Sequence, residues 1–187
     1  MALDIDNHAA NGVILEVNAD QQGSTLLINY QVTNQLAETI YLLNRIFRWT
    51  EAGLEIEADF IYTEVKNGQL RLTKAFIPVP DDVLAEMPDV PYLTAVESGA
   101  VFTEQVRLTI PLEPFHPYDK VGYSDNQHTF EEAELVIGWL AEGSFDLRQG
   151  STPDGDDILA VHHSQAAQAQ RLLKGVVNRP ITAAFGP

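Results

Sequence analysis

Apolar and polar residues alternate along much of this chain, most clearly around the Asn-Gly pair at 67–68. An Asn-Gly pair between alternating apolar residues predicts a two-residue β-hairpin, because a type I′ turn requires positive φ at both central positions. Counting outward from the turn pairs Val65 with Leu70 on one face and Glu64 with Arg71 on the other. The opposite charges of the second pair favour this register. The hairpin supports reading its neighbours as strands too.

A period of two predicts strands in several other segments. Apolar residues recur there at every second position with polar residues between them, which is typical of a strand with one buried face. These predicted strands cover residues 13–18, 26–33, 56–62, 70–77, 102–110 and 158–163. In the strand at 102–110 the predicted inward row is Phe102, Val106, Leu108 and Ile110.

Two further segments, 40–49 and 134–142, are apolar on both faces. Such runs predict central strands that are covered on both sides. Trp49 and Trp139 fall in these two segments, so we expect both to pack in the core. Asn44 and Arg45 are polar within the first run, and we expect them to mark a sheet edge or a buried polar contact that needs partners.

Irregular segments separate the strands. A change of apolar phase near 60–62 predicts a β-bulge, and the acids at the start of 81–87 with a proline behind them predict one short helix. Three prolines within 111–117 predict a stiff, exposed loop. The composition of 164–175 favours a C-terminal helix with Ser164 as N-cap, whereas its alternation also fits a strand.

These elements predict an all-β fold, an antiparallel two-sheet sandwich, because seven or eight strands follow one another without alternating helices. The layout resembles the architecture of immunoglobulin and fibronectin type III domains, although no residue motif indicates a particular family. The antibody pattern of two cysteines around a tryptophan is excluded, because the chain has no cysteine. We expect one domain over 1–187, with its core at about 12–163 and a C-terminal extension at 164–187.

The composition narrows the possible partners. With 27 acidic and 11 basic residues, the formal net charge is −16, which disfavours binding to nucleic acids or anionic membranes and makes a basic partner surface more plausible. No apolar segment has the length of a membrane span. The N-terminal residues lack a secretory signal, so we expect a cytoplasmic protein, or a periplasmic one if a leader has been removed.

Few residues point to catalysis or metal binding. The chain has no thiol nucleophile and no G-x-S-x-G motif, and its five histidines lack H-x-H or H-E-x-x-H spacing. We therefore predict no enzyme activity and no cofactor. The alternative is a metal-dependent carbohydrate-binding protein or hydrolase. Its histidines would be His116, His128 and His163. The set Asp154, Asp156, Asp157 and His163 is a weak alternative as a metal site.

The sequence favours a non-catalytic binding module that acts through loops or an edge strand, as an inhibitor-like or assembly protein. We expect a protein partner or self-association, with contacts from the proline loop at 111–117 and the connector at 78–91, because stiff loops lose little entropy on binding. An edge position for the 40–49 strand would expose aromatic side chains as well. The candidate contact residues are Tyr41, Phe47, Trp49, Phe115, His116 and Tyr118.

Overall fold

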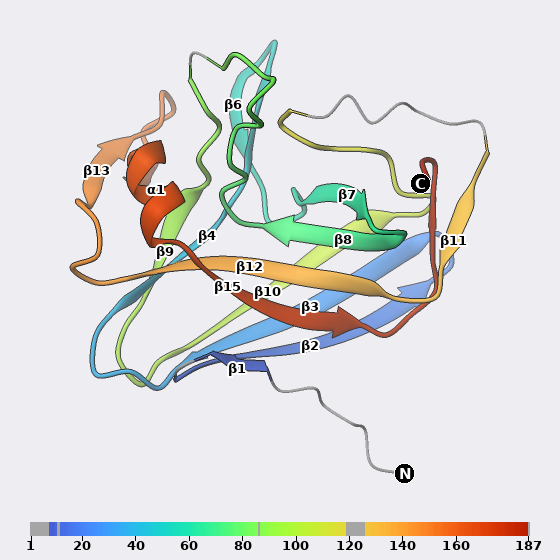
Figure 1. The fold of residues 1–187 in the computed structure, drawn as a ribbon, viewed down its shortest axis with the longest axis horizontal. Helices are drawn as coiled ribbons and strands as arrows, with labels where there is room; N and C mark the ends of the chain where they lie inside the picture. The colour runs from blue at the N-terminus through green and yellow to red at the C-terminus, as the bar shows by residue number, and fades with distance from the viewer. Residues whose placement is uncertain (1–7, 11, 86, 119–125, 187) are drawn as a thin grey trace.

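The computed structural model describes residues 8–10, 12–85, 87–118 and 126–186 (Figure 1). The fold is all-β, as the alternating pattern predicts: 54% of the chain is strand and 4% is helix. In the part of the chain that is described, no helix has the length and apolarity needed to cross a membrane.

The first sheet contains four antiparallel strands in the order β1-β2-β3-β10. Long β2 and β3 pair along their whole length, and β10 pairs with the other edge of β3. These strands are β1 (His8–Ala10), β2 (Val13–Gln22), β3 (Thr25–Asn34) and β10 (Val101–Thr109).

The second sheet is larger and follows the order β13-β14-β9-β4-β12-β8-β7, with β15 paired to β12. Its strands are β4 (Ile40–Arg45), β7 (Tyr62–Lys66), β8 (Gln69–Lys74), β9 (Tyr92–Val96), β12 (Ala133–Ala141), β13 (Arg148–Ser151), β14 (Asp157–Ala160) and β15 (Arg171–Val177). The pair β8–β12 is parallel, which departs from the antiparallel prediction.

Three small elements complete the fold. Strand β5 (Phe47–Thr50) forms a hairpin with β6 (Gly53–Ile56), and β11 (His128–Phe130) pairs with β16 (Ile181–Ala183). The helix α1 (His163–Ala169) lies between β14 and β15 (Figure 1).

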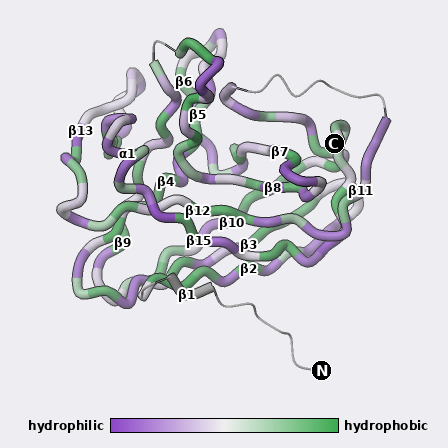
Figure 2. Tube along the Cα trace, in the orientation of Figure 1, coloured by the Kyte–Doolittle hydropathy of each residue, from purple (hydrophilic) through white to green (hydrophobic). Residues whose placement is uncertain are grey.

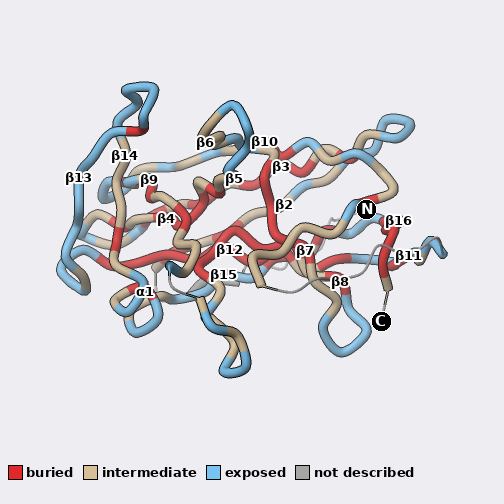
Figure 3. Tube along the Cα trace, turned by 90° about the horizontal axis from the view of Figure 1, so that it is seen from above, coloured by how far each residue is buried: buried red, intermediate tan, exposed pale blue. Residues whose placement is uncertain are grey.

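The main core lies between the two sheets (Figures 2 and 3). Its buried side chains come from the inward rows of β2 and β3 on one side and of β4, β8, β12 and β15 on the other. Leu173, Val177, Ile181 and Phe185 belong to it and are at most 1% exposed. The core therefore continues past residue 163, the limit expected from the sequence, into the last strands of the chain.

The hairpin at β7–β8 has the predicted register. Val65 pairs with Leu70 and Glu64 with Arg71, and the turn residues Asn67 and Gly68 have φ of 53° and 79°. The predicted charge pair also forms, since Arg71 Nη1 lies 3.3 Å from Glu64 Oε1.

The predicted central strand at 40–49 is interrupted. Ile46 separates β4 from β5, and β5 pairs only with β6. Trp49 is consequently 69% exposed, so the prediction that it packs in the core was wrong, whereas Trp139 is fully buried. The second predicted central strand is correct, because β12 has partners along both edges.

Three other local predictions were wrong or incomplete. Residues 57–61 form turns and irregular chain instead of a bulged strand, and no helix occurs within 81–85. The C-terminal segment contains both of the weighed structures: α1 ends at Ala169, and Arg171 begins β15. Its N-cap is His162, whose side chain accepts a hydrogen bond from the Ser164 backbone N–H.

Candidate functional site: an aromatic pocket and a buried polar cluster

A pocket of about 480 Å³ lies between the β5–β6 hairpin and the proline loop. It brings together four of the six predicted contact residues, although they lie more than 60 positions apart in the sequence. Its lining is Phe47, Arg48, Trp49, Asp89, Glu113, Pro114, Phe115, His116 and Pro117. We call this the aromatic pocket. Its wall on the hairpin side ends in the exposed Trp49.

Arg48 and Phe115 form the centre of the aromatic pocket. The Arg48 guanidinium carbon lies 3.9 Å from the centroid of the Phe115 ring and 4.4 Å from that of Phe60. Phe115 in turn contacts Tyr62, with 5.2 Å between ring centroids. A guanidinium stacked between rings gains a cation–π attraction, which holds this exposed arginine in place.

The proline loop is fastened to β7 instead of standing free. Thr63 donates its backbone N–H to the Phe115 carbonyl at 2.7 Å, and Phe115 donates its N–H to Thr63 Oγ1 at 2.8 Å. Farther back, Leu112 is buried and exchanges backbone hydrogen bonds with Thr182 and Ala184. The prediction of an exposed loop was therefore wrong, because most of its residues are half-buried.

Polar groups with shifted pKa values lie behind the aromatic pocket. Burial raises the pKa of Asp89. The pKa of Tyr62 is also raised, first by burial and then by the negative charge of Asp89 and by Tyr118. Tyr118 contacts His116, with 6.3 Å between ring centroids, and burial raises its pKa. Burial makes the charged form of each of these groups less favourable than it is in water.

The remaining predicted site residues lie elsewhere. Tyr41 packs edge-on against Phe145 and is not part of the aromatic pocket. Among the described residues, no group of three or more His, Asp or Glu side chains comes close enough to hold a metal ion, and this includes the set around 154–163. His163 begins α1, where its ring lies 4.1 Å from that of His162.

A buried polar cluster lies between the sheets, and it confirms for Asn44 one of the two predicted alternatives, a buried polar contact with partners. Its members are Lys74, Glu104, Asn44 and Tyr30, from β8, β10, β4 and β3. Lys74 Nζ donates to Glu104 Oε2 at 2.5 Å, and the Tyr30 hydroxyl donates to the same oxygen at 2.7 Å. Asn44 Nδ2 donates to Glu104 Oε1 at 3.2 Å.

Lys74, Glu104 and Asn44 each interrupt an inward-facing apolar row, whereas Tyr30 belongs to such a row. Lys74 follows Leu70 and Leu72 at a spacing of two, and Glu104 falls between Phe102 and Val106. The sequence does contain a signal for this cluster: a polar residue stands where the period of two predicts a buried apolar side chain. It marks a buried polar group that must find partners.

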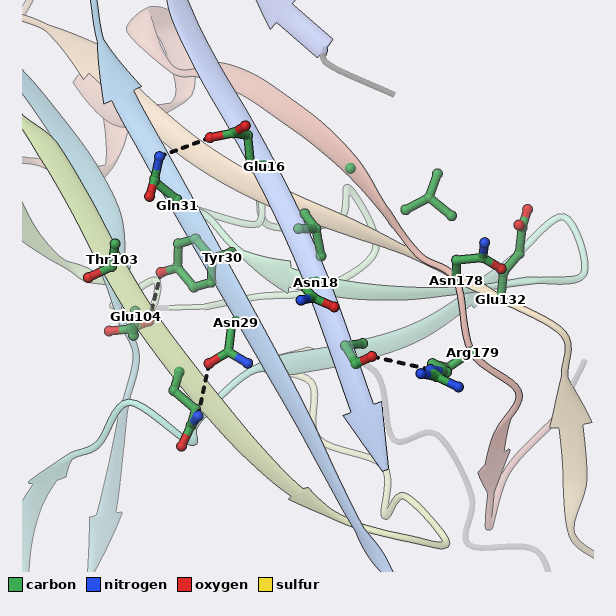
Figure 4. A pocket seen from close by; sticks show the side chains of 15 residues that line it. Glu16, Asn18, Asn29, Tyr30, Gln31, Thr103, Glu104, Glu132, Asn178 and Arg179 are labelled. Atoms are coloured by element: carbon green, nitrogen blue, oxygen red, sulfur yellow. Dashed lines mark hydrogen bonds between the residues drawn. The ribbon is translucent and has the colours of Figure 1, made fainter. Parts of the chain in front are cut away.

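A third feature is a polar groove of about 990 Å³ along β2, β3 and β10 of the first sheet and the end of β15 (Figure 4). Its floor consists of cross-strand rows of amide and carboxylate side chains. Gln31 Nε2 donates to Glu16 Oε2 at 2.9 Å, and Gln105 Nε2 donates to Asn29 Oδ1 at 2.8 Å. Arg179 closes one end with a hydrogen bond to the Ala19 carbonyl at 3.2 Å.

Comparisons with known proteins do not assign a family. No protein-family model matches the chain, and no curated protein or solved structure matches it. Any function must therefore be argued from the pockets and clusters themselves.

Proposed function

We propose that the protein is a non-catalytic binding module that captures a peptide segment of another protein in the aromatic pocket. The observation that carries the proposal is the placement of Trp49, which is 69% exposed at the rim of a pocket lined by aromatic rings. An exposed tryptophan loses hydrophobic stabilisation in the free protein. Interface hot spots are rich in tryptophan, tyrosine and arginine, and Trp49 lies directly beside Arg48.

The chemistry of the aromatic pocket indicates the kind of segment that it binds. Phe47, Trp49 and Phe115 offer apolar surface, while Asp89 and Glu113 add carboxylates to the lining. The whole chain carries a formal charge of −16, which attracts basic ligands. The favoured occupant is therefore an extended peptide with a lysine or arginine next to an apolar side chain.

The pocket is also pre-organised. The two hydrogen bonds between Thr63 and Phe115 fix the proline loop, and the rings of Phe60 and Phe115 hold Arg48. A fixed binding surface loses less conformational entropy when a ligand binds. This supports the loop-mediated mode of binding over one that requires the loop to fold on contact.

Selection from a random displayed-peptide library on the immobilised protein tests the proposal. We expect enriched peptides to share a basic residue beside an apolar one, and to lose affinity at least tenfold for Trp49→Ala, a cost of about 1.4 kcal/mol or more. The matched control is Leu172→Ala, which truncates another exposed apolar side chain, 45% exposed on β15. Peptides whose affinity for Trp49→Ala equals their affinity for the wild type and for Leu172→Ala would refute the site.

A second copy of the chain is the other partner that the sequence indicated. Light scattering during size-exclusion chromatography measures it directly, for the wild type and for Trp49→Ala. A dimer that Trp49→Ala dissociates would make a second copy of the chain the occupant and would contradict capture of a different protein.

We also propose that the two sheets form a sandwich of the immunoglobulin or fibronectin type III type. The single buried cluster shared by the two sheets supports this architecture. The parallel β8–β12 pair argues against a simple version of it. An experimental structure that shows the inter-sheet angle and strand order tests this proposal.

The polar groove favours carbohydrate binding as a second candidate function. Carboxamides carry both donors and acceptors, which match neighbouring hydroxyl groups of a sugar. Five of them line the groove: Asn18, Asn29, Gln31, Gln105 and Asn178. A glycan array with the wild type and Asn29→Ala tests it, and the absence of any glycan signal would exclude this candidate.

A further inference from the structure

Lys74, Glu104 and Asn44 form a triad at the centre of the fold. Lys74 is fully buried and Asn44 is 1% exposed, although both belong to residue types that are usually solvated. One carboxylate joins them, because Glu104 Oε2 accepts from Lys74 Nζ at 2.5 Å and Glu104 Oε1 accepts from Asn44 Nδ2 at 3.2 Å. Figure 4 shows the hydroxyl of Tyr30 pointing at the same carboxylate.

Strand pairing explains why the lysine and the asparagine meet. Leu42 of β4 pairs with Trp139 of β12, and Lys74 of β8 pairs with Ile137 of the same strand. Trp139 also pairs with Arg171 of β15, so β15 lies along one edge of β12 and β4 along the other. Since β8 also lies opposite β15, β4 and β8 follow each other along the same edge of β12. The end of β8 and the segment just after Leu42 therefore come together over Glu104.

The side-chain amide of Asn44 lies beside the carboxylate that also accepts the hydrogen bond from Lys74. Its Oδ1 is buried and has no hydrogen-bond partner among the described residues, while its Nδ2 faces Glu104. The reverse orientation would set Oδ1 against a carboxylate oxygen, which is electrostatically unfavourable. A buried, unpartnered carbonyl oxygen costs free energy. The carbonyl oxygen of Asn44 is therefore left without a hydrogen bond from the described residues, and the amide nitrogen lies beside a carboxylate that can deliver a proton.

We propose that Lys74 and Asn44 form an intramolecular isopeptide bond, with Glu104 as the proton shuttle. An amine attacks a carbonyl only in its unprotonated form, and the dry interior disfavours the ammonium. Burial lowers the pKa of Lys74, although the charge of Glu104 and its hydrogen bond act in the opposite direction. The fold holds both groups in a fixed geometry, so the entropy cost of bringing them together is met during folding and does not add to the reaction barrier.

The reaction balances without any added reagent. Lys74 Nζ first passes a proton to Glu104 along their hydrogen bond, and its lone pair then forms the bond to Asn44 Cγ. The C–N bond to Nδ2 breaks, and Nδ2 leaves as ammonia after taking protons through Glu104. The products are one secondary amide between the two side chains and one ammonium ion, because the departing ammonia takes up the proton that Lys74 first passed to Glu104, and the carboxylate of Glu104 is thereby regenerated.

Intact mass spectrometry of the denatured full chain tests the proposal. We expect the wild type to be lighter than its sequence mass by one ammonia, about 17 Da, because each isopeptide bond releases one. Lys74→Arg, Asn44→Ala and Glu104→Gln should keep their full sequence masses. Tryptic digestion of the wild type should also give one cross-linked species that contains both Asn44 and Lys74, with no cleavage after Lys74.

The controls separate this bond from other losses of ammonia. The Asn-Gly pairs at 11–12 and 67–68 can lose ammonia by cyclisation, and that loss would persist in Lys74→Arg. Lys174→Arg is the matched control, since Lys174 is a paired but half-exposed lysine on β15, and it should show the wild-type loss. A folded wild type at full sequence mass, or a loss that survives Lys74→Arg, overturns the proposal.

Discussion

Replacing Glu104 by leucine removes the only carboxylate within hydrogen-bond distance of Lys74 among the described residues. Among the described residues, Lys74 Nζ would keep one hydrogen bond, to the Ala58 carbonyl at 2.6 Å, and the Tyr30 hydroxyl would lose its acceptor. Lys74 would also keep a free amine in this variant whether or not the wild-type lysine becomes an amide, because the shuttle is absent. Compared with the double variant Glu104→Leu/Lys74→Met, which cannot form the amide either, Glu104→Leu measures what it costs to hold an unpaired amine in the core.

The structure sets the size of the effect. Breaking a buried ion pair by removing one partner typically costs about 3–5 kcal/mol, because the remaining charge is left without compensation. Lys74 has no exposed surface, so we expect Glu104→Leu to lose an amount in this range at neutral pH. Adding Lys74→Met should recover part of the loss, since it removes the uncompensated charge. A half-exposed pair such as Lys174 with Glu134 should contribute less than about 1 kcal/mol.

The loss in Glu104→Leu should also depend on pH. Burial lowers the pKa of Lys74, and removing Glu104 takes away the two larger of the three interactions that oppose this shift, leaving only the charge of Asp59. Between the folded pKa and the higher unfolded pKa, the unfolded chain binds more protons, so stability rises with pH. The largest slope for one group is about 1.4 kcal/mol per pH unit.

Urea unfolding monitored by circular dichroism, repeated between about pH 6 and pH 9, measures both effects. Glu104→Leu should approach the wild type as pH rises, and Lys174→Met should differ from the wild type by a small, constant amount. A Glu104→Leu loss below about 1 kcal/mol, or one that does not change with pH, would refute the view that Lys74 is held in a dry site.

Three other outcomes are expected. Gly138→Ala would place a Cβ 2.8 Å from Ala75 Cβ and 3.0 Å from its Cα, so it should destabilise the fold by about 1–3 kcal/mol in urea unfolding. Gly150→Ala meets only ordinary contacts and should be neutral, and equal effects of the two would contradict the packing argument. Asp89→Asn should make stability fall more steeply as pH decreases, because the raised pKa of Asp89 makes stability rise as pH falls through the interval from its folded to its unfolded value, and the substitution removes this contribution; an unchanged acid limb would count against burial at that position. Trp49→Ala should change thermal stability by less than about 0.5 kcal/mol, since the side chain is mostly exposed, and a large drop in melting temperature would show that it packs in the core instead.

The local pattern of apolar and polar residues was sufficient to predict an element where one strand and its neighbour in sequence determine the structure. The β7–β8 hairpin follows from its turn residues, and β3 and β12 follow from their apolar periods. Pattern was insufficient at 57–61, where an alternating row forms no strand, because no neighbouring strand is in place to pair with it. The segment at 163–177 satisfies both helix propensity and strand alternation, and pairing with β12 decides where one gives way to the other.

The sites depended on contacts between distant segments. The sequence named Phe47, Trp49, Phe115 and His116 for their aromatic character and their neighbourhood to prolines, but it could not bring them together. Their shared pocket exists because Thr63 of β7 fastens the proline loop beside the β5–β6 hairpin. Their role as a contact surface stays a prediction.

The sequence by itself determined that this chain forms strands, where the tightest turn lies, and which face of each strand is apolar, because those properties depend on residues two to five positions apart. Only the tertiary structure decided that Lys74, Asn44 and Glu104 share one point in the core and that Trp49 is left at the rim of a pocket. Sheet order and register set which side chains of distant strands can touch, and neither is encoded in the alternation of a single strand.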